Sequence, residues 1–122
     1  MAISKKLCNI IEALGIHEDN DSIRVLNEIG TNCANDEVRE LTSKALIKKN
    51  VKKSLEIVIK EKGKGINDLS AKVAMSAINE LLSLKDKSFA TNVLEETIAQ
   101  EELDKDIKDT AKSVKALMSF SI

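Results

Sequence analysis

No proline interrupts the 122 residues of this chain. Proline breaks helix interiors because it lacks a backbone N–H and its ring clashes with the preceding turn. Without it, helices can form along the whole sequence. Apolar residues recur at spacings of three and four, which is the period of an amphipathic α-helix. The sequence therefore predicts an all-α fold.

The apolar period predicts seven helices, over residues 4–15, 22–32, 36–49, 51–62, 68–84, 88–101 and 105–119. Connections of about two to six residues suit antiparallel helix neighbours. Because no interdomain linker separates the helices, we expect one all-helical domain over residues 1–122.

Polar and glycine residues mark the expected helix ends. Gly15 and Asn50 are expected to end helices, as are the two glycines in the KGKG sequence of residues 62–65. The expected N-caps and capping turns are Ser4, Asp21 or Ser22, Asn35 or Asp36, Asn67 or Asp68, the 86–88 turn, and Asp104.

The side-chain composition limits what the chain can bind. It contains no Trp and no Tyr, and its only aromatic residues are Phe89 and Phe120. His17 is its only histidine. Aromatic stacking on bases, aromatic cages for quaternary ammonium and His-rich metal sites are therefore excluded. The core is expected to consist of Ile, Leu, Val and Ala.

Three of the expected helices resemble one another, at residues 36–49, 68–82 and 105–118. Each follows an acidic or capping group and has small residues at its centre, which allow neighbouring helices to approach closely. Shorter amphipathic helices precede them at 22–32, 51–62 and 88–101. This periodicity is typical of helical repeats. It predicts three helical hairpins, with the first helix as a cap at one end.

The pattern resembles the HEAT-like or armadillo-like helical repeat family. The order of acidic, apolar, basic and small residues carries the resemblance, and it is clearest in Asp36, Val38, Arg39, Ala45 and Leu46. Residues 21–84 also look like a small, uncharacterised archaeal family of helical proteins. The resemblance implies a short stack of hairpins. An antiparallel helix bundle is the alternative, because the helices of such a bundle are all amphipathic and therefore resemble one another in sequence.

Charge is divided along the chain, although the formal net charge is only -1. Residues 12–43 hold two Arg against eight acidic residues, and residues 86–109 hold three Lys against eight acidic residues. Between them, residues 44–65 hold eight Lys against two Glu. Such segments attract one another within the fold or between copies. A homodimer is therefore one expected form, and the apolar C-terminal segment 117–122 offers a second surface for it.

The lysine-rich segment 44–64 is a candidate site for a polyanion such as nucleic acid. None of its cations is Arg and no aromatic residue is interleaved, which disfavours specific base recognition. The competing interpretation is a solvated face or a surface that pairs with acidic groups. The candidate polyanion-binding residues are Lys48, Lys49, Lys52, Lys53, Lys60, Lys62 and Lys64.

No catalytic or metal-binding motif is recognisable. His17 lies in an acidic turn without a second ligand of its kind, and Cys8 and Cys33 form no CxxC pair. Gly63 and Gly65 lack the residue order of a phosphate-binding loop. We expect no catalytic residue, metal or cofactor, so an enzyme of unknown type is the least supported alternative.

These observations favour a non-catalytic scaffold or adaptor that binds another protein or a second copy. The resemblance places its partner on the face of the second helices, where Arg39, Lys72 and Lys108 lie near the helix starts. The sequence shows no signal peptide and no membrane span. Two unpaired cysteines are typical of a reducing compartment, so we expect a cytoplasmic protein with no membrane partner.

Overall fold

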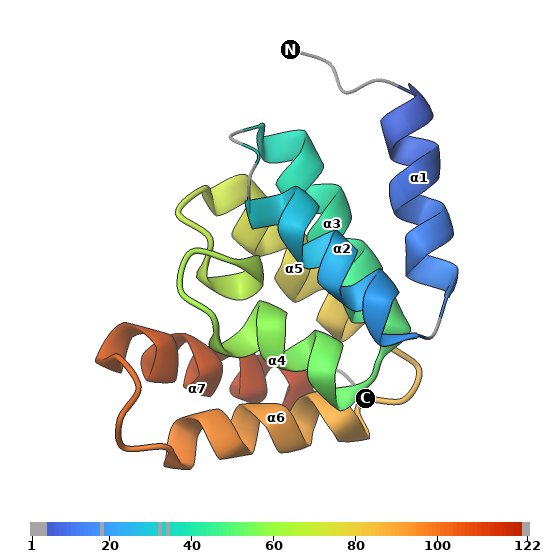
Figure 1. Ribbon diagram of the computed structural model, residues 1–122. Helices are drawn as coiled ribbons and strands as arrows, with labels where there is room; N and C mark the ends of the chain where they lie inside the picture. The colour runs from blue at the N-terminus through green and yellow to red at the C-terminus, as the bar shows by residue number, and fades with distance from the viewer. Residues whose placement is uncertain (1–4, 18, 32, 34, 121–122) are drawn as a thin grey trace.

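The computed structural model describes residues 5–17, 19–31, 33 and 35–120, and within them every regular element is helical (Figure 1). The prediction of an all-α fold is confirmed. The elements are α1 (Lys5–Ile16), α2 (Asn20–Thr31), α3 (Asp36–Lys49), α4 (Lys52–Lys60), the 3-10 helix η1 (Gly65–Asn67), α5 (Ala71–Leu82), α6 (Ser88–Ala99) and α7 (Lys105–Phe120).

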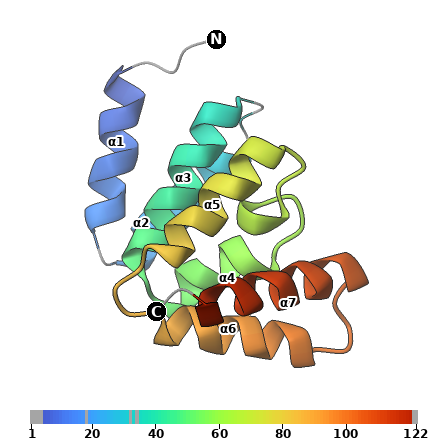
Figure 2. The ribbon, with the colours of Figure 1, turned by 180° about the vertical axis from the view of Figure 1, so that it is seen from behind.

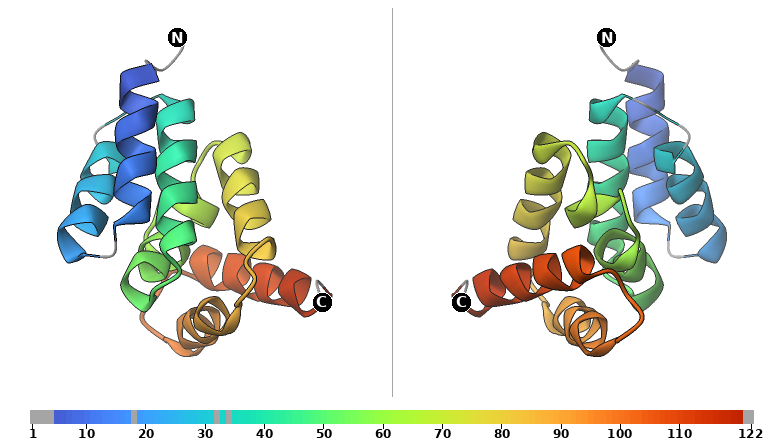
Figure 3. Two further views of the ribbon diagram at one scale, coloured as in Figure 1. Left: turned by 90° about the vertical axis from the view of Figure 1, so that its right-hand side faces the viewer. Right: turned by 90° about the vertical axis from the view of Figure 1, so that its left-hand side faces the viewer.

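Three helices that are not consecutive in the chain, α1, α3 and α5, lie in one row and run in the same direction (Figure 2). Helix α2 packs behind α1 and α3. The α6–α7 hairpin lies across the lower ends of α3 and α5, with α4 between this hairpin and α3 (Figure 3). The second helices of the three predicted hairpins therefore differ, because α3 and α5 are parallel neighbours whereas α7 crosses them.

Hydrogen bonds at the starts of α3 and α5, and between the segments that follow them, link the two helices. At their starts, Ser70 Oγ donates to Asp36 Oδ2 at 3.0 Å. Beyond their other ends, Asn50 Nδ2, just after α3, donates to the carbonyl oxygen of Asp86, in the segment before α6, at 2.9 Å. Helices α4 and α5, the expected middle hairpin, are joined through η1, which packs against both of them.

Small residues bring the first three helices close together, as the sequence predicts. A Cβ added to Gly15 of α1 would lie 3.2 Å from the Cβ of Ala45 on α3. A Cβ on Gly30 of α2 would lie 2.7 Å from Thr42 Oγ1. The prediction that Gly15 ends the first helix is wrong, because α1 continues to Ile16 and uses Gly15 for this contact.

Two predicted helix ends are confirmed by backbone geometry. Asn35 caps α3, since its Oδ1 accepts a hydrogen bond from the backbone N–H of Glu37 at 2.8 Å. Asn50 ends α3 in the left-handed conformation, with φ of 50°. Asparagine tolerates this conformation better than most other residues.

Two predicted caps are wrong by a few residues. Asp19 caps α2, and the hydrogen bonds that its carboxylate accepts from the side chain and backbone of Ser22 lower its pKa. Ser70 caps α5, accepting from the backbone N–H of Val73. Asn67 cannot cap this helix because it belongs to η1, and Asp68 binds an arginine instead. Ser4 lies outside the described residues.

The core is aliphatic and continuous, and every helix contributes to it. Both phenylalanines stay at the surface, where Phe89 is 47% and Phe120 is 87% exposed. Of the C-terminal apolar segment, Met118 is buried and Leu117 is half exposed, while residues 121–122 lie outside the described part. The largest fully buried side chains are Ile11, Ile23, Leu26, Ile47, Leu55, Ile59, Leu81, Leu94, Val58, Val73, Val93 and Val114.

A partly buried ion pair joins the start of α3 to the segment before α5. The side chain of Asp68 is only 3% exposed, and its Oδ2 lies 3.0 Å from Arg39 Nε. Arg39 also donates to the carbonyl oxygen of Cys33 at 3.3 Å and pairs with Asp36. The hydrogen bond with Asp68 is the main cause that raises the pKa of Arg39. The guanidinium therefore fastens three chain segments together.

We predict that Arg39→Leu lowers the free energy of unfolding by about 2 kcal/mol, because Asp68, whose side chain is 3% exposed, loses the charged donor of a partly buried pair. Urea denaturation followed by circular dichroism measures this change. The matched control is Arg24→Leu, which removes a pair with Glu28 whose side chains are 61% and 59% exposed. An exposed pair of this kind contributes less than about 1 kcal/mol. Equal effects of the two substitutions would contradict the prediction.

The turn after α4 depends on one glycine. Gly65 has φ of 54°, and a Cβ there would lie 2.4 Å from the carbonyl oxygen of Val58. The turn therefore packs directly on the backbone of α4. Gly63 also has a positive φ, of 76°, but a Cβ added to it would point into open space, with no neighbouring atom within 4 Å.

Gly65→Ala is expected to destabilise the protein by about 3 kcal/mol. The alanine would be strained in the left-handed conformation, and its Cβ would also overlap with the backbone of Val58. Gly63→Ala places alanine in the left-handed conformation without a steric contact, which should lower the free energy of unfolding by only about 1 kcal/mol. Thermal unfolding of both variants separates steric contact from backbone strain. Equal losses of stability at the two positions would show that the contact with Val58 is unimportant.

Candidate functional site

Much of the lysine-rich segment is paired with acidic residues of the same chain. Lys52 and Lys60 both approach Glu96 on α6, with N–O distances of 3.6 Å. Lys62 lies 3.7 Å from Asp104, just before α7. The basic segment and the second acidic segment therefore attract each other within the fold, which is one of the two outcomes that their opposite charge predicts.

Two further lysines of this set also have partners. Lys64 donates to Glu61 and to Asn27 Oδ1, each at 2.8 Å. Lys49 donates to the carbonyl oxygen of His17. Only Lys48 and Lys53 are exposed without an ion pair within the described residues. The seven candidate lysines are thus spread over α3, α4 and the following turn, and most are engaged.

The three candidate partner-binding residues lie in different surroundings. Arg39 is mostly buried in the ion-pair cluster with Asp36 and Asp68. Lys72 is exposed in the first turn of α5, and Lys108 is half buried in the first turn of α7. Since α7 crosses the row formed by α3 and α5, Lys108 does not extend that row (Figure 3).

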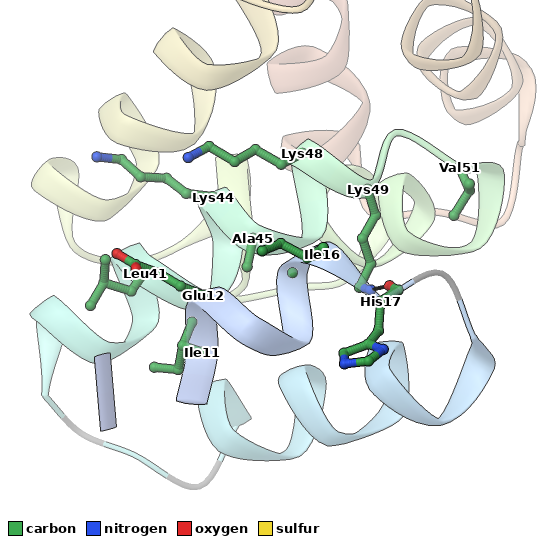
Figure 4. Close-up of a pocket in the computed structure, with 11 residues that line it drawn as sticks. Ile11, Glu12, Ile16, His17, Leu41, Lys44, Ala45, Lys48, Lys49 and Val51 are labelled. Atoms are coloured by element: carbon green, nitrogen blue, oxygen red, sulfur yellow. Dashed lines mark hydrogen bonds between the residues drawn. The ribbon is translucent and has the colours of Figure 1, made fainter. Parts of the chain in front are cut away.

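A groove of about 530 Å³ lies between α1 and α3 (Figure 4). This volume is within the range of about 300–1,000 Å³ that is usual for ligand sites. Its surface combines an apolar floor with charged groups at the edges. The apolar lining residues are Ile11, Ile16, Leu41, Ala45 and Val51, and the polar ones are Glu12, His17, Lys44, Lys48 and Lys49.

Helical periodicity builds both walls of the groove. On α3, Leu41, Lys44, Ala45 and Lys48 are three or four residues apart and therefore share one face. Gly15 on α1 faces Ala45 across the floor. Because these are among the smallest side chains, the two helices touch at the floor, and the space of the groove lies above this contact.

Apolar side chains remain accessible in this groove. Ile16 is 81% exposed and Val51 is 37% exposed. One end of the groove is bounded by Lys49, at the end of α3, which donates to the carbonyl oxygen of His17, just after α1 (Figure 4). The groove therefore combines a small exposed apolar surface with charged side chains at its edges.

The edges of the groove carry an uneven charge. Lys44 and Lys48 extend from α3 in the same direction (Figure 4), and Glu12 is the acidic lining residue. Lys44 lies 3.9 Å from Glu40, which is a weak ion pair, and its side chain is 37% exposed. The α3 edge is therefore positively charged and accessible to an incoming carboxylate.

Sequence reasoning did not find this groove. Ile16 lies beyond the expected first helix, and Lys44 is outside the candidate lysine set. Leu41 and Ala45 lie on the apolar face that predicts core packing, although the structure leaves Leu41 only partly buried. The only sequence signal of this groove is the alternation of apolar and basic residues from Leu41 to Lys48. This pattern indicates a groove only when the position of α1 beside α3 is known.

Other reactive side chains are not gathered into a site. Cys8 and Cys33 are free and partly exposed, and His17 is exposed. No group of three or more His, Cys, Asp and Glu residues with metal-binding geometry occurs in the described part of the chain. Over the same residues, none of the helices has the length and apolar character needed to cross a membrane.

Comparison of the chain with protein-family models, with curated proteins and with solved structures finds no match.

The pairing of Lys52 and Lys60 with Glu96 leads to a prediction. Glu96→Ala should lower the free energy of unfolding by about 1 kcal/mol at low salt and by less at high salt, because exposed ion pairs are weak and screened. Chemical denaturation at two salt concentrations measures both effects. Glu101→Ala is the control, since Glu101 is exposed and forms no ion pair among the described residues. A salt-independent loss at Glu96 would contradict the electrostatic origin.

Proposed function

We propose that this protein is a non-catalytic interaction module that binds another protein in the groove between α1 and α3. The observation that supports this proposal is the exposed apolar surface of the groove, where Ile16 is 81% exposed beside an edge that carries lysines. Protein interfaces combine an apolar centre with a polar rim. The groove provides both on a rigid pair of helices.

The arrangement of the helices supports a scaffold role. Short helical stacks present side-by-side helices as a continuous surface for partners. The parallel row of α1, α3 and α5 forms such a surface, with α2 and α4 behind it. This row is also consistent with a relationship to HEAT-like repeats, which we retain as part of the proposal.

Binding of a polyanion is less well supported. A phosphate-binding surface needs several cations that are free to replace counterions. Lys52, Lys60 and Lys62 are instead engaged with acidic residues of the same chain. Two lysines, Lys44 and Lys48, beside an apolar floor fit a protein partner better than a nucleic acid backbone.

Site-specific photo-cross-linking in the native lysate tests the proposal. A benzophenone amino acid at position 16 is expected to capture a discrete partner, and unlabelled wild-type protein should compete for it. Lys48→Glu in the labelled protein should reduce this capture severalfold, because an interfacial charge then opposes binding. Both positions are exposed, so neither change should affect folding.

The control places the same cross-linker at position 69, where the leucine is 98% exposed and lies outside the groove. The proposal is wrong if position 16 captures nothing, or if both positions capture the same proteins. Capture of a second copy of this chain would replace the adaptor function with self-association.

A further inference from the structure

We infer that the occupant of the α1–α3 groove is a short amphipathic helix of another protein, with acidic residues along one edge of its apolar face. This inference rests on the proposed function and specifies the partner's chemistry. Three features of the groove support this inference: its shape, the residues that line it and the charge of its edge.

The shape of the groove matches a helix. Its two walls are helical stripes that run in the same direction, and on α3 the stripe extends from Leu41 to Lys48. Two helical turns cover about 11 Å of axis. A third helix can seat its side-chain ridge between two parallel helices. The contact therefore requires about two to three turns of partner helix with apolar residues at positions i, i+3 or i+4, and i+7.

This structure lacks the features that the other common modes of peptide recognition require. β-Strand addition needs a sheet edge, and the described residues contain no strand. Grooves for proline-rich peptides are lined by aromatic side chains, whereas the lining residues here include no Phe, Tyr or Trp. Phosphopeptide sites use clustered arginines, but the chain's two arginines, Arg24 and Arg39, are both paired with acidic residues.

The charge of the α3 edge specifies acidic residues in the partner. Lys44 and Lys48 are one helical turn apart and extend in the same direction (Figure 4). Lys48 is exposed and forms no ion pair within the described chain, and Lys44 has only the 3.9 Å contact with Glu40. Two carboxylates one turn apart on a partner helix can therefore meet both lysines at once. Desolvation at the interface strengthens such pairs.

The acidic α6 helix of a second copy is a poorer occupant than a helix from another protein. Its two glutamates are already engaged within the chain, because Glu95 lies 3.5 Å from Lys115 and Glu96 approaches both Lys52 and Lys60. Docking α6 of another copy in the groove would require these pairs to break. These engaged pairs disfavour α6 of a second copy, and cross-linking at position 16 distinguishes any other contact between copies from a different chain.

A display selection tests the inference with the full-length protein. A library of alanine-rich helical peptides, with all side chains on one half of the helix randomised, is selected against the wild type and against the Lys44→Glu/Lys48→Glu variant. The wild type is expected to enrich apolar residues at i, i+3 or i+4, and i+7 together with two acidic residues one turn apart. The double variant should enrich basic residues at those two positions instead.

The enriched acidic peptide then provides quantitative controls. Its affinity should fall about tenfold or more for the double variant and recover when the two peptide acids become lysines, which a purely structural effect of the substitutions would not produce. Lys53→Glu, an exposed change on α4 outside the groove, should leave the affinity unchanged. Circular dichroism verifies that each variant is folded, and Ile16→Asp should abolish binding without affecting the fold.

Several outcomes would overturn the inference. They are the absence of enriched peptides, enrichment without acidic residues, selection of the same peptides by the double variant, and displacement of the peptide by a long-chain fatty acid such as palmitate, which would make the groove a lipid site. If cross-linking at position 16 still captures a partner, such a result overturns the acidic helix and leaves the proposed function standing. Failure of the cross-linking itself overturns the proposed function.

Discussion

The arrangement of this protein depends on the partly buried ion pair between Arg39 and Asp68. An arginine that is fixed by two carboxylates and a carbonyl oxygen holds the start of α3 against the segment that leads into α5. The hydrogen bond between Asn50 and Asp86 links the end of α3 to the segment that follows α5. Helix α3 lies parallel to α5 on one side and packs against α1 on the other, where the groove is formed.

Helix packing and charge pairing together determine what the surface offers. Gly15 and Ala45 let α1 and α3 approach closely, and their contact forms the floor of the groove. Most lysines on α4 and the turn after it are occupied by acidic residues of the same chain, such as Glu96. Lys48 remains accessible at the edge of the groove. The groove retains both accessible charge and exposed apolar area, and we assign binding to it.

Local signals predicted the helices well and their ends less well. The expected range 36–49 is that of α3, because Asn35 and Asn50 act through short-range hydrogen bonds and backbone conformation. The fifth helix was expected to begin near residue 68 but begins at Ala71. Asp68 would be a suitable cap by itself, yet the distant Arg39 competes for its carboxylate. Gly15 was likewise interpreted as a helix end, because its contact with Ala45 involves a residue thirty positions away in the chain.

The sequence alone determined the helical class, the aliphatic core and the opposite charge of neighbouring segments, since each follows from local periodicity or composition. Only the tertiary structure decided that α1 rather than α7 extends the row of α3 and α5, which lysines are neutralised, and where an apolar surface stays open. The physical reason is that helix pairing depends on side-chain contacts between residues far apart in the chain. An amphipathic period specifies that a helix has an apolar face, but it does not specify which neighbour covers that face.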